Sequence, residues 1–108
     1  MEATKMSVEE SKQIAGTILQ QLGGRKFIMM TGAKNFFCDG PSCGMKIMRN
    51  QSKANYLKIT LNSLDLYDME FFAIDRQFNH IHVQEFNGVY DDMLQSIFTK
   101  VTGLYTHL

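Results

Sequence analysis

The spacing of apolar residues changes twice along this chain, and the segments between the changes are short. Apolar residues lie at helical spacing near the start, as in Ile14, Ile18 and Leu22, and again after residue 89. Between these ends they alternate with polar residues, most cleanly in YLKITLN, Tyr56 to Asn62. The connections are too short for the crossovers that parallel strands need. The pattern predicts a two-layer α+β domain, with an N-terminal helix, a mainly antiparallel meander sheet of about five to six strands and a C-terminal helix.

Local signals place the ends of these elements. Ser7 and Glu10 form a Ser-x-x-Glu capping box at the start of the first helix, and Gly23-Gly24 supplies a left-handed stop. Asn87 is the expected cap of the second helix. Helices are therefore expected over 7–22 and 89–102, and strands over 26–31, 35–38, 45–48, 56–62, 66–76 and 79–86.

Length and composition indicate one globular domain over residues 1–108, with residues 1–6 as a frayed leader. Hydrophobic residues make up 44% of the chain, which is enough to build a core without a disulfide or a metal. The first residues lack the apolar segment of a signal peptide, and no apolar run approaches the length of a membrane span. We expect a cytoplasmic protein, in a bacterial host cell, where thiols stay reduced.

The hairpin from Tyr56 to Arg76 has a register that its pattern predicts. With Ser63-Leu64-Asp65 in the loop, apolar residues face apolar residues across the two strands, and Lys58 faces Glu70. A two-residue loop would instead pair Ile59 with Asp68 and place a carboxylate on the buried, apolar face of the hairpin. The expected pairs are Leu61–Tyr67, Ile59–Met69, Leu57–Phe71, Thr60–Asp68 and Lys58–Glu70.

Charge is balanced overall but divided along the chain. The chain has 11 basic and 11 acidic residues, which argues against a nucleic-acid coat over the whole surface. Between Arg25 and Lys58 the only acid is Asp39, among seven basic residues. Between Asp65 and Asp92 the only base is Arg76, among seven acids. Cross-strand pairing accounts for part of this division, and it leaves four cations without a local partner: Lys34, Lys46, Arg49 and Lys53.

The stretch FFCDGPSCGMKI contains the only two cysteines, Cys38 and Cys43. Asp-Gly-Pro-Ser between them is strong turn chemistry, so we interpret the stretch as a turn between two short strands. A zinc site would need two more ligands, and His80 with His82 is the one other pair on offer, at a spacing that matches no known zinc pattern. A disulfide between the hairpin arms fits the geometry, but a reducing cytoplasm argues against it. We therefore expect no metal and no cofactor.

His80 and His82 alternate with Ile81 and Val83, so they are expected on the open face of the sheet. That face would also carry polar residues of the neighbouring strands. A small metal-dependent enzyme built from these histidines and nearby acids is one alternative function. The sequence has no nucleophile elbow, phosphate loop or dinucleotide fingerprint, and we expect a protein that is not an enzyme. The acids in question are Asp65, Asp68, Glu70 and Asp75.

The basic segment also contains aromatic residues, a mixture typical of proteins that bind single-stranded nucleic acid. Phe36 and Phe37 are adjacent, so on a regular strand one would point inward and the other outward. The residues that we expect to form a binding surface are Lys34, Phe37, Lys46, Arg49, Lys53, Tyr56 and Lys58.

Three stretches, LQQLGGRKFIMMTGAKNF, YLKITLNSLDLYDMEFF and VYDDMLQSIFTKVTGLYTHL, resemble a family of small proteins carried by bacteriophages and other bacterial mobile elements. MTGAKNF and TGLYT are the most specific parts, whereas the segment from Cys38 to Asn50 departs from the family pattern. The resemblance brings no catalytic residues with it. It implies a protein that acts by binding, for example by inhibiting a host defence complex or by handling replication intermediates.

The leading hypothesis from sequence is a non-enzymatic accessory protein of a phage or mobile element that binds a host or phage protein or nucleoprotein complex. Inhibition of a nucleic-acid-targeting defence system such as CRISPR is its concrete form. Direct binding of single-stranded nucleic acid is the alternative, and it would show as a steep loss of affinity with salt. Pairing of the last strand or of the open sheet face with a second copy, giving a homodimer, is a further expectation.

Overall fold

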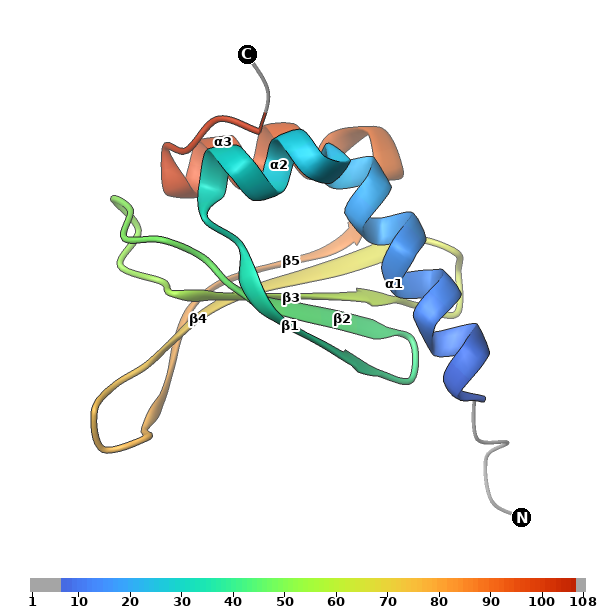
Figure 1. Ribbon diagram of the computed structural model, residues 1–108, viewed down its shortest axis with the longest axis horizontal. Coiled ribbons are helices and arrows are strands. Elements are labelled where there is room, and N and C mark those ends of the chain that lie inside the picture. Colours follow the sequence, from blue (N-terminus) through green and yellow to red (C-terminus); the bar gives the residue numbers. More distant parts are fainter. Residues whose placement is uncertain (1–6, 107–108) are drawn as a thin grey trace.

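Three α-helices lie on one face of a five-stranded antiparallel sheet in the computed structural model, which describes residues 7–106 (Figure 1). The expected leader, residues 1–6, lies outside this range. The fold is the α+β meander that the sequence predicts. Its elements are α1 Val8–Leu22, α2 Gly24–Thr31, β1 Lys34–Asp39, β2 Ser42–Lys46, β3 Tyr56–Leu61, β4 Tyr67–Ile74, β5 His80–Val89, the 3-10 turn η1 Asp91–Met93 and α3 Leu94–Thr102.

Helix α1 begins at the predicted capping box. The Ser7 hydroxyl accepts from Glu10 N–H, and the Glu10 carboxylate accepts from Ser7 N–H, both at 3.1 Å. Ile18 and Leu22 are fully buried on its inner side. The capping box therefore satisfies free backbone donors at the start of α1, and one face of the helix is buried in the core.

The segment KFIMMT is helix α2, and the prediction of a strand over 26–31 was wrong. Gly23 and Gly24 take positive φ angles, and the pair turns the chain into a second helix instead of a strand. Phe27 and Thr31 are both fully buried, and the Thr31 hydroxyl donates to Phe27 O at 2.7 Å. Their i,i+4 spacing is helical, but a run of four apolar residues, Phe27 to Met30, is too short to distinguish helical spacing from alternation. The sheet consequently has five strands.

The strands follow one another across the sheet in chain order, β1-β2-β3-β4-β5. Each of the five cross-strand pairs predicted between β3 and β4 is present. Apolar residues of these strands point towards the helices, where Phe98 of α3 packs against Phe27 of α2 at 5.1 Å and against Phe71 of β4 at 6.3 Å between ring centroids. One face of the sheet is thus covered by helices, and the other is open (Figure 1).

Strand β5 runs to Val89, beyond the predicted end at Phe86, and the α-helix begins only at Leu94. Asn87 lies in the strand and is not a helix cap, which corrects the prediction. A bulge with Gly88 at φ +66° keeps the strand paired, and the Asp68 carboxylate accepts from Gly88 N–H at 3.0 Å. The helix-spaced residues after 89 begin with a 3-10 turn, η1.

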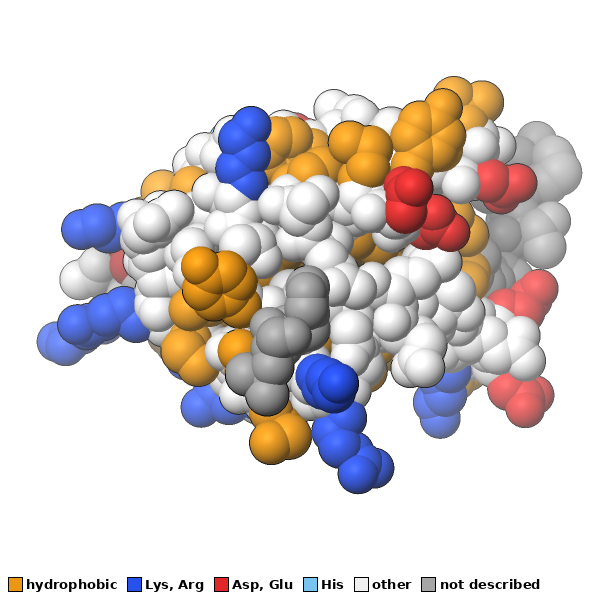
Figure 2. All heavy atoms as spheres, turned by 90° about the horizontal axis from the view of Figure 1, so that it is seen from above, with side chains coloured by type: hydrophobic (Ala, Val, Ile, Leu, Met, Phe, Trp, Pro, Cys, Tyr) orange, Lys and Arg blue, Asp and Glu red, His pale blue; other side chains and the backbone are white. Residues whose placement is uncertain are grey.

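Charged side chains are unevenly distributed on the helical side of the molecule. Lys and Arg project mainly from one end and along one side, and Asp and Glu gather towards the end where α1 begins (Figure 2). None of the helices within 7–106 has the length and apolar character needed to cross a bilayer.

Candidate functional site

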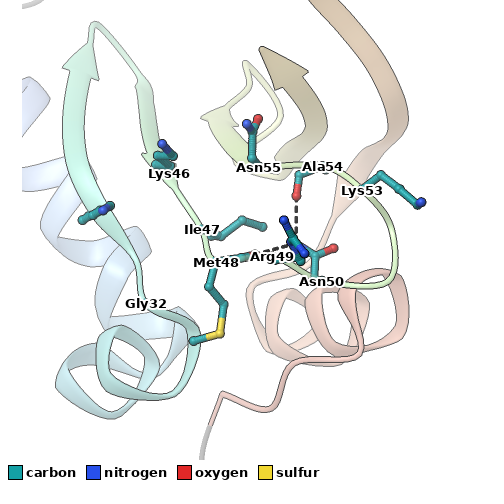
Figure 3. A pocket seen from close by; sticks show the side chains of 10 residues that line it. Gly32, Lys46, Ile47, Met48, Arg49, Asn50, Lys53, Ala54 and Asn55 are labelled. Carbon is teal, nitrogen blue, oxygen red and sulfur yellow. Dashed lines mark hydrogen bonds between the residues drawn. The ribbon is translucent and has the colours of Figure 1, made fainter. Parts of the chain in front are cut away.

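A cleft of about 850 Å³ opens between the start of β1, the end of β2 and the connection from β2 to β3 (Figure 3). Its lining includes four cations and, among the described residues, no acid and no histidine. These are the four basic residues that the sequence left without a local partner: Lys34, Lys46, Arg49 and Lys53.

The cations of the cleft repel one another. Lys34 and Lys46 are direct cross-strand partners on β1 and β2, a position in which like charges destabilise a sheet. Over residues 7–106, the ion pairs within 4.0 Å are His80–Glu70 and His82–Glu70, which join β4 and β5 and lie outside the lining of the cleft. The division of charge along the sequence is therefore not cancelled in the cleft, and the cleft attracts anions.

The loop that forms one wall of the cleft is held by its own side chains. The Asn50 amide donates to Met48 O at 2.9 Å and to Ala54 O at 2.7 Å (Figure 3), and its carbonyl oxygen accepts from Ser52 N–H at 3.0 Å. Lys53 takes a left-handed φ of +71° within this turn and extends outward from it (Figure 3). Arg49 and Lys53 are thus presented on a loop whose shape is set before any ligand arrives.

Three contacts fasten this loop to the rest of the fold. Met48 N–H donates to Thr31 O at the end of α2, and Gln51 N–H donates to Thr102 O at the end of α3. Asn55 bridges to β4, where its side chain accepts from Ile74 N–H at 3.0 Å and donates to Ile74 O at 3.3 Å. The wall of the cleft therefore moves with the sheet and the helices rather than independently.

An aromatic pair lies beside the cleft on the open face of the sheet. Tyr56 is the cross-strand partner of Lys46, and its ring stacks on Phe72 with centroids 5.4 Å apart and planes 12° from parallel. His80 meets the Phe72 ring edge-on at 4.4 Å. Tyr56 is half-buried and Phe72 is buried, so Tyr56 is the ring of this pair that a ligand can reach.

Phe37 and Lys58 lie outside the lining of the cleft. Phe37 faces Gly44 across β1 and β2, and its ring covers the glycine. One of Phe36 and Phe37 was expected to point inward and the other outward, and this prediction was wrong. The two side chains are about equally exposed, at 41% and 39%. They lie in an edge strand that has a bulge between Lys34 and Phe37. Lys58 lies between Gly44 and Glu70, as the cross-strand partner of both.

The histidines lie on the open face as predicted, but they pair with Glu70. The Glu70 carboxylate lies 3.5 Å from His80 Nε2 and 3.7 Å from His82 Nδ1, although Lys58 is its cross-strand partner. Two of the other acids considered for a metal-dependent enzyme have structural partners: Asp68 accepts from Gly88 N–H, and Asp75 accepts from Gln77 and Asn79 in the β4–β5 turn. Within 7–106, no three His, Cys, Asp or Glu side chains are grouped as metal ligands would be.

Cys38 and Cys43 are cross-strand partners in the β1–β2 hairpin, and both thiols are free. The stretch is a turn between two strands, as predicted, although Cys43 is buried rather than facing solvent. The structure does not bring the cysteines to the histidines, because β3 and β4 lie between the Cys hairpin and β5.

Sequence reasoning identified the cations of the cleft but missed the residues that position them. Asn50, Gln51 and Asn55 shape and fasten the loop. The two asparagines carry a local signal, since asparagine favours turns, whereas Gln51 carries none. The comparisons made with protein-family models, with curated proteins and with solved structures gave no match to this chain.

Proposed function

We propose that this chain is a non-enzymatic binding protein whose basic cleft holds the phosphate backbone of a single-stranded nucleic acid. The observation that carries the proposal is the direct opposition of Lys34 and Lys46 in a cleft that Arg49 and Lys53 also line. Such an arrangement weakens the free protein and gains from a ligand with several negative charges. A phosphate backbone supplies them at regular intervals.

The aromatic pair favours a single strand over a duplex. Tyr56 follows Lys46 directly across the sheet, so a base attached to a backbone in the cleft can stack on it. Bases are free to stack on a side chain only when they are not paired within a duplex. The cleft and the ring together match the combination of cationic groove and stacking platform that single-strand binders use.

The test is the affinity for a fluorescent single-stranded oligonucleotide, measured by anisotropy over a range of salt concentrations. If the four cations of the cleft each neutralise one phosphate, the logarithm of the association constant falls with the logarithm of salt with a slope of roughly −3, from about −0.7 per contact. The double variant Lys46→Gln with Arg49→Gln reduces both the affinity and the slope.

Lys12→Gln with Lys100→Gln is the matched control, because it removes the same charge from positions on α1 and α3 outside the cleft. Equal losses in the two double variants would contradict the proposal. Tyr56→Leu separates stacking from charge: we expect a loss of about 1–3 kcal/mol of binding free energy with an unchanged salt slope.

A second candidate is binding of a nucleoprotein complex, including inhibition of a defence complex such as a CRISPR effector. Phe78 favours it, because this ring is 87% exposed at the tip of the β4–β5 hairpin. The test is retention of a purified CRISPR effector ribonucleoprotein on the immobilised protein. Loss of retention in Phe78→Ser, with oligonucleotide binding intact, would favour this candidate over direct binding.

A further inference from the structure

The two cysteines occupy a pair of positions that suits a cross-strand disulfide. Asp39 and Ser42 close the β1–β2 hairpin around Gly40-Pro41, and Cys38 faces Cys43 one step further from the turn. Residues that face each other in an antiparallel pair have side chains on the same side of the sheet. Whether the two sulfur atoms can bond depends on whether Cys38 and Cys43 are a hydrogen-bonded or a non-hydrogen-bonded pair of the two strands.

The backbone bonds of β2 answer that question. Ile47 N–H donates to Asn55 O, and Leu61 N–H donates to Pro41 O, so residues 41 and 47 direct their backbone groups to the β3 side. Alternate residues of a strand bond to the same neighbour, and Cys43 belongs to this alternation. It therefore bonds towards β3 and leaves Cys38–Cys43 as a non-hydrogen-bonded pair of β1 and β2.

Non-hydrogen-bonded pairs bring the two Cα atoms to about 4.5 Å, with the side chains closer than in the other kind of pair. This separation lies within the range that disulfides span, about 4.4–6.8 Å between Cα atoms. The backbone therefore needs little movement to connect the sulfur atoms.

Access to the two thiols differs. Cys38 is exposed and lines a hollow of about 410 Å³ beside the start of α1, whereas Cys43 is 2% exposed in the core on the helix-covered face of the sheet. A small oxidant can reach the first thiol and not the second. The order of events follows from this difference.

We propose that Cys38 and Cys43 form a reversible modification site, at which a low-molecular-weight disulfide such as oxidised glutathione converts the thiol pair into an intramolecular disulfide. The Cys38 thiolate attacks one sulfur of the oxidant, and one glutathione thiolate leaves. The Cys43 thiolate then attacks the Cys38 sulfur of the mixed disulfide and displaces the second glutathione. The two cysteines lose two protons and two electrons, which reduce the oxidant to two thiols.

The closed form would join the edge strand β1 covalently to β2. These strands carry Lys34 and Lys46 at their other ends, so the bond would restrain one wall of the cleft. The inference does not depend on what the cleft binds, and a reducing compartment would return the pair to thiols.

The experiment treats the full chain with oxidised glutathione and follows acid-quenched samples by mass spectrometry with thiol counting. We expect the wild type to pass through a single glutathione adduct and to end as a monomer without free thiols. Cys43→Ser should stop at the adduct, and Cys38→Ser should keep its buried thiol. A wild-type protein that stops at the adduct, or that joins two chains through Cys38, would overturn the proposal.

The pH dependence of closure gives a second readout, which tests whether a thiolate with a raised pKa is the attacking group. Burial, and to a lesser degree the neighbouring Cys38, raises the pKa of Cys43 to about 11. Because the thiolate is the nucleophile, decay of the adduct should accelerate about tenfold per pH unit between about pH 7 and pH 9. A decay rate independent of pH would mean that Cys43 is not the attacking group.

Discussion

The ring of Phe37 lies over Gly44, its direct cross-strand partner, and occupies the space that a Cβ on this glycine would need. Gly44→Ala should therefore push the ring away and lower the free energy of unfolding by roughly 1 kcal/mol, because the partly exposed ring can move and alanine offsets part of the cost. Urea unfolding measures the change. Gly16→Ala is the control, since nothing lies within 4 Å of an added Cβ there, and alanine should stabilise α1 by about 0.5–1 kcal/mol. A stabilising Gly44→Ala would contradict the packing.

The opposition of Lys34 and Lys46 should be visible in stability as well as in binding. Lys46→Gln removes the repulsion and should raise the free energy of unfolding by a few tenths to about 1 kcal/mol at low salt. The gain should shrink at high salt, because salt screens exposed charges. Lys100→Gln in the last turn of α3 should instead lose stability, by about 0.3–1 kcal/mol, because it removes a cation from the negative end of the helix dipole.

Asn55 fastens the cleft loop to β4 through both backbone groups of Ile74. Asn55→Ala should lower the free energy of unfolding by about 1–3 kcal/mol, because it leaves partly buried backbone groups without a partner. Hydrogen exchange of the Ile74 amide should accelerate more than that of amides in the middle of β3. Asn87→Ala, at an exposed position of β5, should change neither. Equal acceleration in both strands would point to global destabilisation instead.

Asp75 gives a prediction about pH. Hydrogen bonds from Asn79, first from its backbone and then from its side chain, hold the pKa of this carboxyl below its usual range. A lowered folded-state pKa means that the stabilisation is present above the unfolded pKa of about 3.9 and is lost as pH falls through the folded value. The difference in stability between the wild type and Asp75→Asn should therefore be largest near neutral pH and vanish in acid. A difference that grows on acidification would contradict this.

The register of β3 and β4 was predictable because each face of the hairpin carries its own pattern. A shift by one residue would bury Asp68 or Glu70, so the apolar face alone selects the pairing. Helix α2 was not predictable in the same way. Its six-residue core fits both periods, and the Gly23-Gly24 pair that precedes it signals an end rather than a turn into a second helix.

The cleft, like the fold, was predictable only in part. Its four cations were identifiable because no acid lies near them in the sequence, and that property survives folding. Its shape depends on bonds between distant segments, such as Gln51 with Thr102 and Asn55 with Ile74, and no local pattern encodes these. Which aromatic ring lies beside the cleft was equally a tertiary matter, since Phe37 lies over Gly44 and Tyr56 is the cross-strand partner of Lys46.

The order of the strands has a consequence for how the molecule forms during synthesis. Every strand pairs only with its neighbours in the chain, so no strand has to insert between two others. As the polypeptide emerges from the ribosome, each new strand meets a partner that is already present, and the contacts are local ones that favour rapid folding. Helix α3 forms last and contacts α1 across a long sequence separation. The sheet can therefore grow from one edge to the other before the last helix seals the core.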